Sequence, residues 1–194
     1  MKFESIVSEI IQVVKQLIFA PKQFWQDSKE GDVDSSTNVK LFIFAVFLSG
    51  LTAFLGELIW SKAFLWYFAL GLSLRVIFSY LLLWFVSGFL INKLALSYKA
   101  QLTKGVVSNV LIFSLLPAII ISFFVNLFPG LYPLNMLGLY GFYLFYQGVD
   151  SCFNLPKENL SRYVLLALVL IIFVSGLTYT LTWAVLKEVF PYGV

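Results

Sequence analysis

The chain has 194 residues, of which 60% are hydrophobic and only 12% are charged, and its formal net charge at pH 7 is +3. Because soluble domains carry about 25% charged residues, this composition excludes an ordinary soluble domain and indicates an integral membrane protein. The sequence has no His and one Cys, Cys152, which excludes a His/Cys metal site, a Cys–His nucleophile pair and an intramolecular disulfide. The small positive charge fits membrane topology better than nucleic-acid binding, and we expect no cofactor.

Residues 3–19 are predicted to form an amphipathic helix, because their apolar side chains fall on one arc of a helix and their polar side chains on the other. Such a helix is too polar to span a bilayer. It either lies flat in the membrane interface or packs on the cytoplasmic ends of the spans. We expect Pro21 to end this helix, Phe24 and Trp25 to anchor the chain at the interface, and residues 26–38 to form a polar connector.

Five apolar segments follow, and each is predicted to cross the membrane as a helix of about 20 residues. The predicted spans are residues 39–60, 64–91, 105–127, 131–149 and 162–186. The sequence therefore predicts an all-α integral membrane protein. A cytoplasmic unit of residues 1–38, with the amphipathic helix and the connector, precedes a five-helix transmembrane bundle of residues 39–194.

The distribution of Lys and Arg predicts the orientation, because cytoplasmic loops are enriched in both. The N-terminal segment has five Lys, the loop after the second span has three, and the loop after the fourth span has Lys157 and Arg162. The opposite side has Lys62 and Lys187. The bias alternates from loop to loop, as five spans require. It places the N-terminus in the cytoplasm and the C-terminus outside.

The fourth predicted span has two different faces. One carries small residues, namely Gly138, Gly141 and Gly148, and the other carries polar residues, namely Tyr140, Tyr143, Gln147 and Asp150. Small residues allow another helix to approach closely in a membrane. The polar face requires hydrogen-bond partners or water, because lipid offers neither.

Ionisable residues inside the predicted spans are the first candidates for chemistry, because each costs a few kcal/mol at the bilayer centre unless it is paired or hydrated. Arg75 is the deepest and lies at about the level of Tyr140 and Tyr143. We expect Arg75 to meet these tyrosines through hydrogen bonds or cation–π contact. Glu57 lies about 10 Å shallower, and it would pair with Arg75 only if the arginine side chain reached outward.

This polar cluster is the candidate site, and its members are Arg75, Glu57, Tyr140, Tyr143, Gln147 and Asp150. Polar contacts of this kind commonly hold membrane helices together, so the cluster has a purely structural interpretation. In the alternative interpretation, it lines a polar cavity that binds a lipid headgroup or a solute. The sequence has no glycine-rich phosphate loop, zinc-protease helix or serine nucleophile elbow, and we expect no enzymatic activity.

The second half of the chain resembles the Yip family, the Ypt/Rab-interacting integral membrane proteins and their prokaryotic relatives. The resemblance rests on a proline in the third span, the FPGLYPL reversal, the LGLYGFYLFYQGV span and the NLPKENLSRY loop. The matching positions are Pro117, Pro129, Leu131, Leu134, Leu139, Tyr140, Gly141, Tyr143, Leu144, Tyr146, Gly148, Pro156 and Tyr163. Residues 19–25 (FAPKQFW) also resemble a short N-terminal element of bacterial members.

The resemblance implies a five-span bundle with a cytoplasmic N-terminus and no catalytic signature. Eukaryotic members act with Rab GTPases in traffic between the endoplasmic reticulum and the Golgi. This chain lacks their "DLYGPLW"-like element and their long cytoplasmic N-terminal domain, so we do not expect it to bind a Rab-type GTPase. It is most similar to bacterial members, which implies a bacterial inner membrane, or the endoplasmic reticulum and Golgi if the source is eukaryotic.

Two functional hypotheses follow. The first is a non-enzymatic scaffold or adaptor that binds a homo-oligomeric or other membrane-protein partner, or shapes the lipid bilayer through its amphipathic helix. The second is a transporter or lipid-handling protein with a polar intramembrane site around Arg75. A scaffold predicts a dry, closed bundle, whereas a transporter or lipid-handling protein needs a polar cavity that opens to one side or to lipid.

Overall fold

The computed structural model describes residues 12, 14–30, 35–62, 65–100, 102–103 and 105–189. All regular elements in these ranges are helical. After a helical segment at residues 14–19, the elements are α2 (Pro21–Glu30), α3 (Ser35–Trp60), α4 (Trp66–Ser97), α5 (Val106–Leu127), the 3₁₀ helix η1 (Pro129–Leu139), α6 (Tyr140–Cys152) and α7 (Lys157–Val189). The all-α prediction is confirmed for the described residues.

Four of the described helices are long and apolar enough to cross a membrane. They are Ser36–Trp60, Trp66–Ser97, Val106–Leu127 and Lys157–Glu188, with mean hydropathies of 2.0 to 2.5. They overlap the first, second, third and fifth predicted spans. The fourth predicted span corresponds to two consecutive elements, η1 and α6, and begins as a helix at Pro129.

The helices extend beyond the apolar runs on which the predicted spans were based. Residues 92–97 were expected in a polar loop, yet α4 continues through them to Ser97, because no helix-breaking residue interrupts the run. The helix then ends with Lys99 in a left-handed conformation at φ 57°. The Lys99 and Ala100 amides donate to the carbonyls of Leu96 and Ala95, which is the hydrogen-bond pattern of a Schellman cap.

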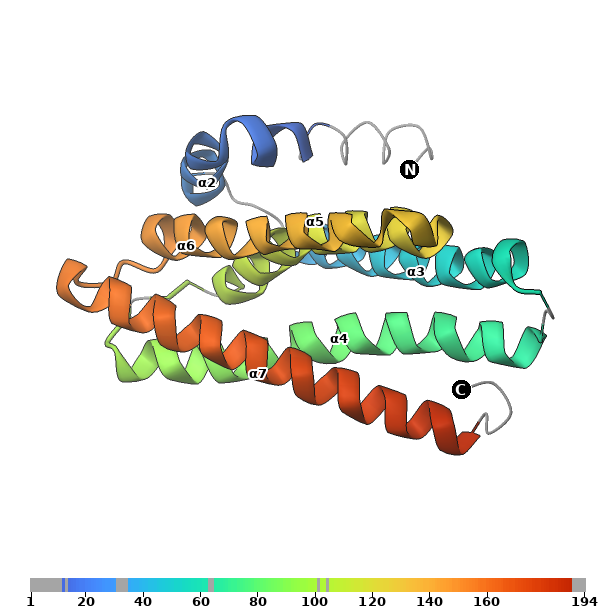
Figure 1. Ribbon diagram of the computed structural model, residues 1–194. Coiled ribbons are helices and arrows are strands. Elements are labelled where there is room, and N and C mark those ends of the chain that lie inside the picture. The colour runs from blue at the N-terminus through green and yellow to red at the C-terminus, as the bar shows by residue number, and fades with distance from the viewer. Residues whose placement is uncertain are drawn as a thin grey trace.

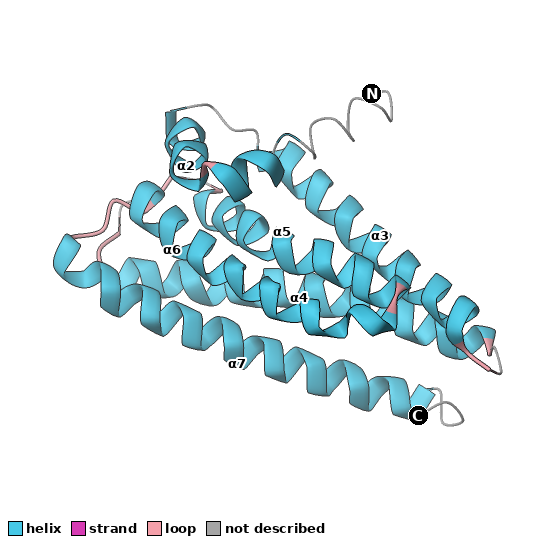
Figure 2. Ribbon diagram, turned by 45° about the horizontal axis from the view of Figure 1, so that its top comes forward, coloured by secondary structure: helices cyan, strands magenta, loops and turns pink. Residues whose placement is uncertain are grey.

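Helices α3 to α7 run side by side along one axis, with α2 near the end at which α6 terminates (Figures 1 and 2). Helix α3 packs on both α4 and α5, and α5 also packs on η1 and α6. Helix α7 packs mainly on α4. Helices α6 and α7 are therefore held by different neighbours, and the contact between them is small.

The chain before α3 differs from its prediction. Pro21 does interrupt the first helix, but it also begins α2, since proline is well suited to the first helical position. The predicted connector is thus helical up to Glu30. Phe24 and Trp25 are core residues with 7% and 1% of their surface exposed, so their assignment as interfacial anchors was wrong.

The N-terminal segment is docked on the bundle by a few buried side chains. Leu17 is 2% exposed, and its carbonyl accepts a hydrogen bond from the Tyr140 hydroxyl of α6 at 3.0 Å. The Phe24 and Trp25 rings pack edge-on against Phe113 of α5, at centroid distances of 4.8 and 5.9 Å. Residues 14–30 therefore pack on α5 and α6, and the part of the predicted amphipathic helix before residue 12 lies outside the described residues.

Candidate functional site

The glycine face of η1 and α6 allows close contact with α5, as predicted. A side chain at Gly141 would collide with the backbone carbonyl of Ser114, whereas one at Gly138 would meet Ala118 at an ordinary 3.5 Å. Gly148 faces the Trp25 ring and Val110, each 3.0 Å from where a Cβ would lie. This face joins α6 to α5 and to the N-terminal segment, and it leaves the rest of η1 exposed.

The 3₁₀ winding of η1 aligns residues at a spacing of three. The segment Pro129–Leu139 winds as a 3₁₀ helix, in which residues i and i+3 lie on the same face. Pro129, Tyr132 and Asn135 therefore form one stripe, and all three line a cavity.

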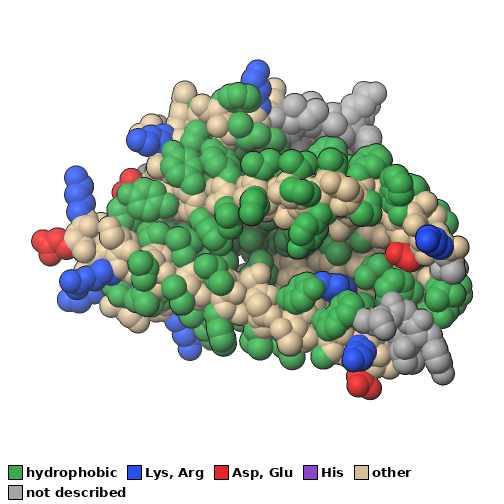
Figure 3. All heavy atoms as spheres, in the orientation of Figure 1, with side chains coloured by type: hydrophobic (Ala, Val, Ile, Leu, Met, Phe, Trp, Pro, Cys, Tyr) green, Lys and Arg blue, Asp and Glu red, His purple; other side chains and the backbone are tan. Residues whose placement is uncertain are grey.

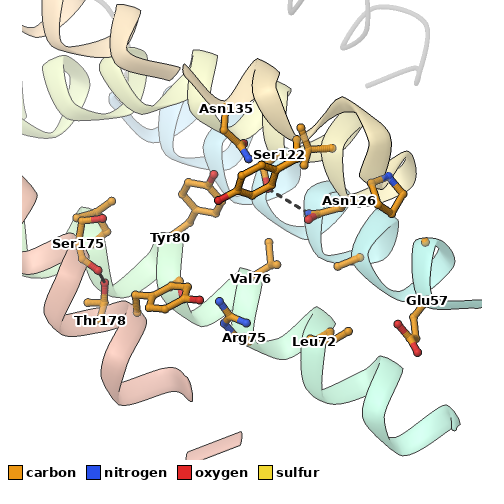
Figure 4. A pocket seen from close by; sticks show the side chains of 18 of the residues that line it. Glu57, Leu72, Arg75, Val76, Tyr80, Ser122, Asn126, Asn135, Ser175 and Thr178 are labelled. Carbon is orange, nitrogen blue, oxygen red and sulfur yellow. Dashed lines mark hydrogen bonds between the residues drawn. The ribbon is translucent and has the colours of Figure 1, made fainter. Parts of the chain in front are cut away.

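This polar cavity has a volume of about 820 Å³ and lies between α3, α4, α5, η1 and α7. Arg75 and Glu57 are the charged residues of its lining, and both are half-buried. Ser122, Asn126 and Asn135 stand across the cavity from Arg75 (Figure 4). The space-filling view shows the hollow on this face, with acidic and basic side chains at its edge (Figure 3).

A second, more apolar cavity of about 300 Å³ adjoins the first. Four residues line both cavities, namely Tyr80, Leu83, Asn135 and Ser175. The walls of the second cavity come mainly from apolar residues of α5, η1, α6 and α7, such as Leu115, Phe142 and Ile171. Together the cavities provide a compartment with two charged side chains next to one whose lining has none.

Arg75 does not contact the tyrosines of α6. Its guanidinium carbon lies 4.4 Å from the Tyr179 ring centroid and 5.0 Å from the Trp183 ring centroid, both on α7. The predicted contact with Tyr140 and Tyr143 is therefore wrong, because α4 packs mainly on α3 and α7 and has no comparable contact with α6. The identity of the neighbouring helix could not be inferred from the sequence.

The family model of the Yip1 domain matches residues 15–178. The chain belongs to the Yip family. No curated protein and no solved structure matches the chain. The Yip-family region includes the docked N-terminal segment and the linings of both cavities up to Thr178, whereas Tyr179 and Trp183, which cover Arg75, follow it.

The predicted cluster is split in this Yip-family chain. Arg75 and Glu57 line the polar cavity, but neither cavity is lined by the four polar residues of α6, namely Tyr140, Tyr143, Gln147 and Asp150. Tyr140 binds the N-terminal segment and stacks at 5.5 Å on Tyr143, which is 42% exposed. Gln147 is buried at 7% exposed, and Asp150 is exposed.

Sequence reasoning missed the amides and hydroxyls that form the polar wall of the cavity. The Asn126 amide donates to the Ser49 carbonyl at 3.3 Å and to the Ser122 hydroxyl at 3.1 Å, and Ser49 donates to Ser122 at 3.1 Å. These bonds hold α3 against α5 beside the cavity. Two features of the sequence could have indicated this wall. Asn126 and Asn135 both stand in apolar runs, and Asn135 follows Tyr132 at a spacing of three.

The polar cavity of the Yip-family protein can recognise a ligand by charge and hydrogen bonding. Within the described ranges, no group of three His, Cys, Asp or Glu could hold a metal ion. The cavity offers one cation, one anion and several neutral donors and acceptors. Such a set can bind a polar group inside the bundle.

Proposed function

We propose that this Yip-family protein is a lipid-handling membrane protein whose polar cavity receives the headgroup of a membrane lipid. The adjacency of the two cavities carries this proposal. A lipid has a polar and an apolar part, and the protein offers a polar compartment of about 820 Å³ that adjoins an apolar one of about 300 Å³. A dry, closed bundle, as expected of a pure scaffold, would lack both.

A lateral route for lipid is supported by the packing of the helices on either side of the cavities. Helix α7 packs on α4, and η1 packs on α5. Ser175 of α7 and Asn135 of η1 line both cavities, so the cavities lie between the two groups. Since no residue of η1 is buried, a lipid could enter between η1 and α7 without unfolding a packed interface.

The topology that we propose has five spans, with η1 and α6 together forming the fourth. Eleven 3₁₀ residues at about 2.0 Å and thirteen α-helical residues at about 1.5 Å give roughly 40 Å, which exceeds the hydrocarbon thickness of about 30 Å. The excess of Lys and Arg supports a cytoplasmic N-terminus and an external C-terminus. The polar cavity then adjoins the outer leaflet of a bacterial inner membrane.

Obstruction of the junction between the cavities tests the function. Ser175→Trp adds a large side chain where the two cavities meet. Leu177→Trp is the matched control, because Leu177 lies on the same helix, is 46% exposed and lines neither cavity. We expect Ser175→Trp to lower lipid occupancy about tenfold in native mass spectrometry, which corresponds to about 1.4 kcal/mol. Equal occupancy in both variants would overturn the proposal.

A scaffold or adaptor is the second candidate, and one observation on α7 favours it. A Cβ added at Gly176 would have no heavy atom within 4 Å, so a helix of a second copy or of another membrane protein could approach there closely. Gly176→Ile should then weaken self-association in detergent, measured by single-molecule photobleaching. An unchanged oligomer distribution would remove this support.

A further inference from the structure

The polar cavity contains one positive and one negative side chain that are not paired with each other. In the part of the chain that the structure describes, no ion pair joins Arg75 to Glu57. Neither side chain makes a hydrogen bond or an ion pair with another described residue. The Arg75 guanidinium lies over the rings of Tyr179 and Trp183. Its N–H groups lie at the guanidinium edge and remain available toward the cavity (Figure 4).

The positions of the two charges follow from the packing of α3 on α4. A side chain at Gly50 of α3 would touch Ser73 and Ile77 of α4, so Gly50 and Arg75 lie at about one level of the bundle. Glu57 follows Gly50 by seven residues, which is about 10 Å along a helix. Since α3 and α4 are antiparallel (Figure 1) and side chains lean toward the helix N-terminus, Arg75 and Glu57 lean toward each other.

Two separated opposite charges in a partly desolvated cavity favour a ligand that carries both complementary charges. We infer that the cavity selects a zwitterionic headgroup in which an anionic phosphate or carboxylate is joined by a short link to a primary ammonium. The anion would accept hydrogen bonds from Arg75, and the ammonium would donate to Glu57. This inference rests on the proposed function and specifies the ligand of the same cavity.

Other headgroup types satisfy the cavity less well. A purely anionic headgroup pairs with Arg75 but leaves the Glu57 carboxylate unpaired and close to like charge. A choline headgroup has a positive charge without an N–H, so it cannot donate a hydrogen bond to Glu57. A neutral sugar headgroup leaves both ionised side chains without an opposite charge. The expected order is therefore phosphatidylethanolamine first, with phosphatidylcholine and phosphatidylglycerol below it.

The test measures competition between defined lipids for the full chain in nanodiscs, by native mass spectrometry of the released protein. Wild type should retain phosphatidylethanolamine at least tenfold over phosphatidylglycerol. Glu57→Gln removes the negative charge at nearly constant volume and should abolish this preference. Arg75→Gln should weaken retention of both lipids about tenfold. Glu188→Gln, an exposed position on α7 outside the cavity, is the control and should behave as wild type.

The outcomes separate this inference from the function on which it depends. Equal retention of the two lipids in wild type would overturn the zwitterion assignment, while the lipid-handling function would stand if Ser175→Trp still lowered retention. A preference that survives Glu57→Gln would also overturn the assignment. If Ser175→Trp did not lower lipid retention, the proposed lipid-handling function itself would be overturned.

A second part of the experiment shows whether the zwitterionic ligand is a lipid or a soluble molecule. Phosphoethanolamine has the same two charges but no acyl chains. If it fails to displace phosphatidylethanolamine at millimolar concentration, the ligand is the lipid, and the apolar cavity contributes to binding. If it displaces the lipid from wild type but not from Glu57→Gln, the charge assignment is supported and the ligand is a soluble zwitterion. Displacement that is equal in both proteins would overturn the assignment.

Discussion

The two ends of the bundle are made of the same apolar helices but are packed by different means. At the end near α2, Trp25 is buried against Gly148, and the Tyr163 hydroxyl donates to the Ile91 carbonyl at 3.3 Å. At the other end, no residue of η1 is buried, and a cavity of about 820 Å³ separates η1 from α7. Aromatic and glycine residues close the first end, whereas polar side chains line the second.

The difference indicates a division of roles. A bundle in lipid gains stability from packing and from satisfied hydrogen bonds, because lipid is as apolar as the side chains themselves. The closed end, with Trp25 at its centre, provides that packing. The open end contains Arg75, whose charge is costly in a membrane unless a ligand, water or an aromatic ring compensates it. Substitutions at the closed end should therefore lower stability, and substitutions at the open end should lower ligand binding.

The largest loss of stability is expected for Trp25→Ala. Trp25 is 1% exposed, and its removal would leave a large void between α2, α5 and α6, which typically costs about 3–5 kcal/mol. Trp66→Ala is the control, because Trp66 is also an aromatic residue but is 64% exposed at the other end of the bundle. Thermal unfolding in detergent should show a large decrease for Trp25→Ala alone. Similar decreases for both variants would contradict the packing difference.

A smaller loss of stability is expected for Gly141→Ala, for which Gly138→Ala provides a control. The new methyl group would collide with the Ser114 carbonyl, which belongs to the backbone of α5 and cannot rotate away. Overpacking of this kind costs about 1–3 kcal/mol. Gly138→Ala, three residues earlier, meets Ala118 at 3.5 Å and should be nearly neutral. Equal melting temperatures for the two variants would show that α5 and α6 separate without cost.

The features that the sequence predicted well are those fixed by local pattern. The glycine spacing of α6 predicted a face of close approach, which Ser114 and Val110 occupy. The four longest apolar runs likewise form helices that are long enough to cross a membrane. The predictions failed where the answer depended on which helices are neighbours. Arg75 meets Tyr179 rather than Tyr140, and Trp25 enters the core, because side-chain depth says nothing about the order of helices around the bundle.

The smallest effect on stability is expected for Arg75→Gln. Its cation–π contacts with Tyr179 and Trp183 contribute about 0.5–1 kcal/mol each at half-exposed positions, and the new amide avoids the cost of an ionised group in lipid. The melting temperature should fall by only a few degrees.

Lys93→Gln is the control for this variant, since Lys93 makes a similar contact with Phe89 at 4.7 Å, remote from the cavity. Both variants should melt alike, and only Arg75→Gln should lose bound lipid. If Arg75→Gln instead unfolded the protein as Trp25→Ala is expected to do, Arg75 would be a packing residue. The open end would then depend on it for its structure, and the separation between a packed end and a binding end would be wrong.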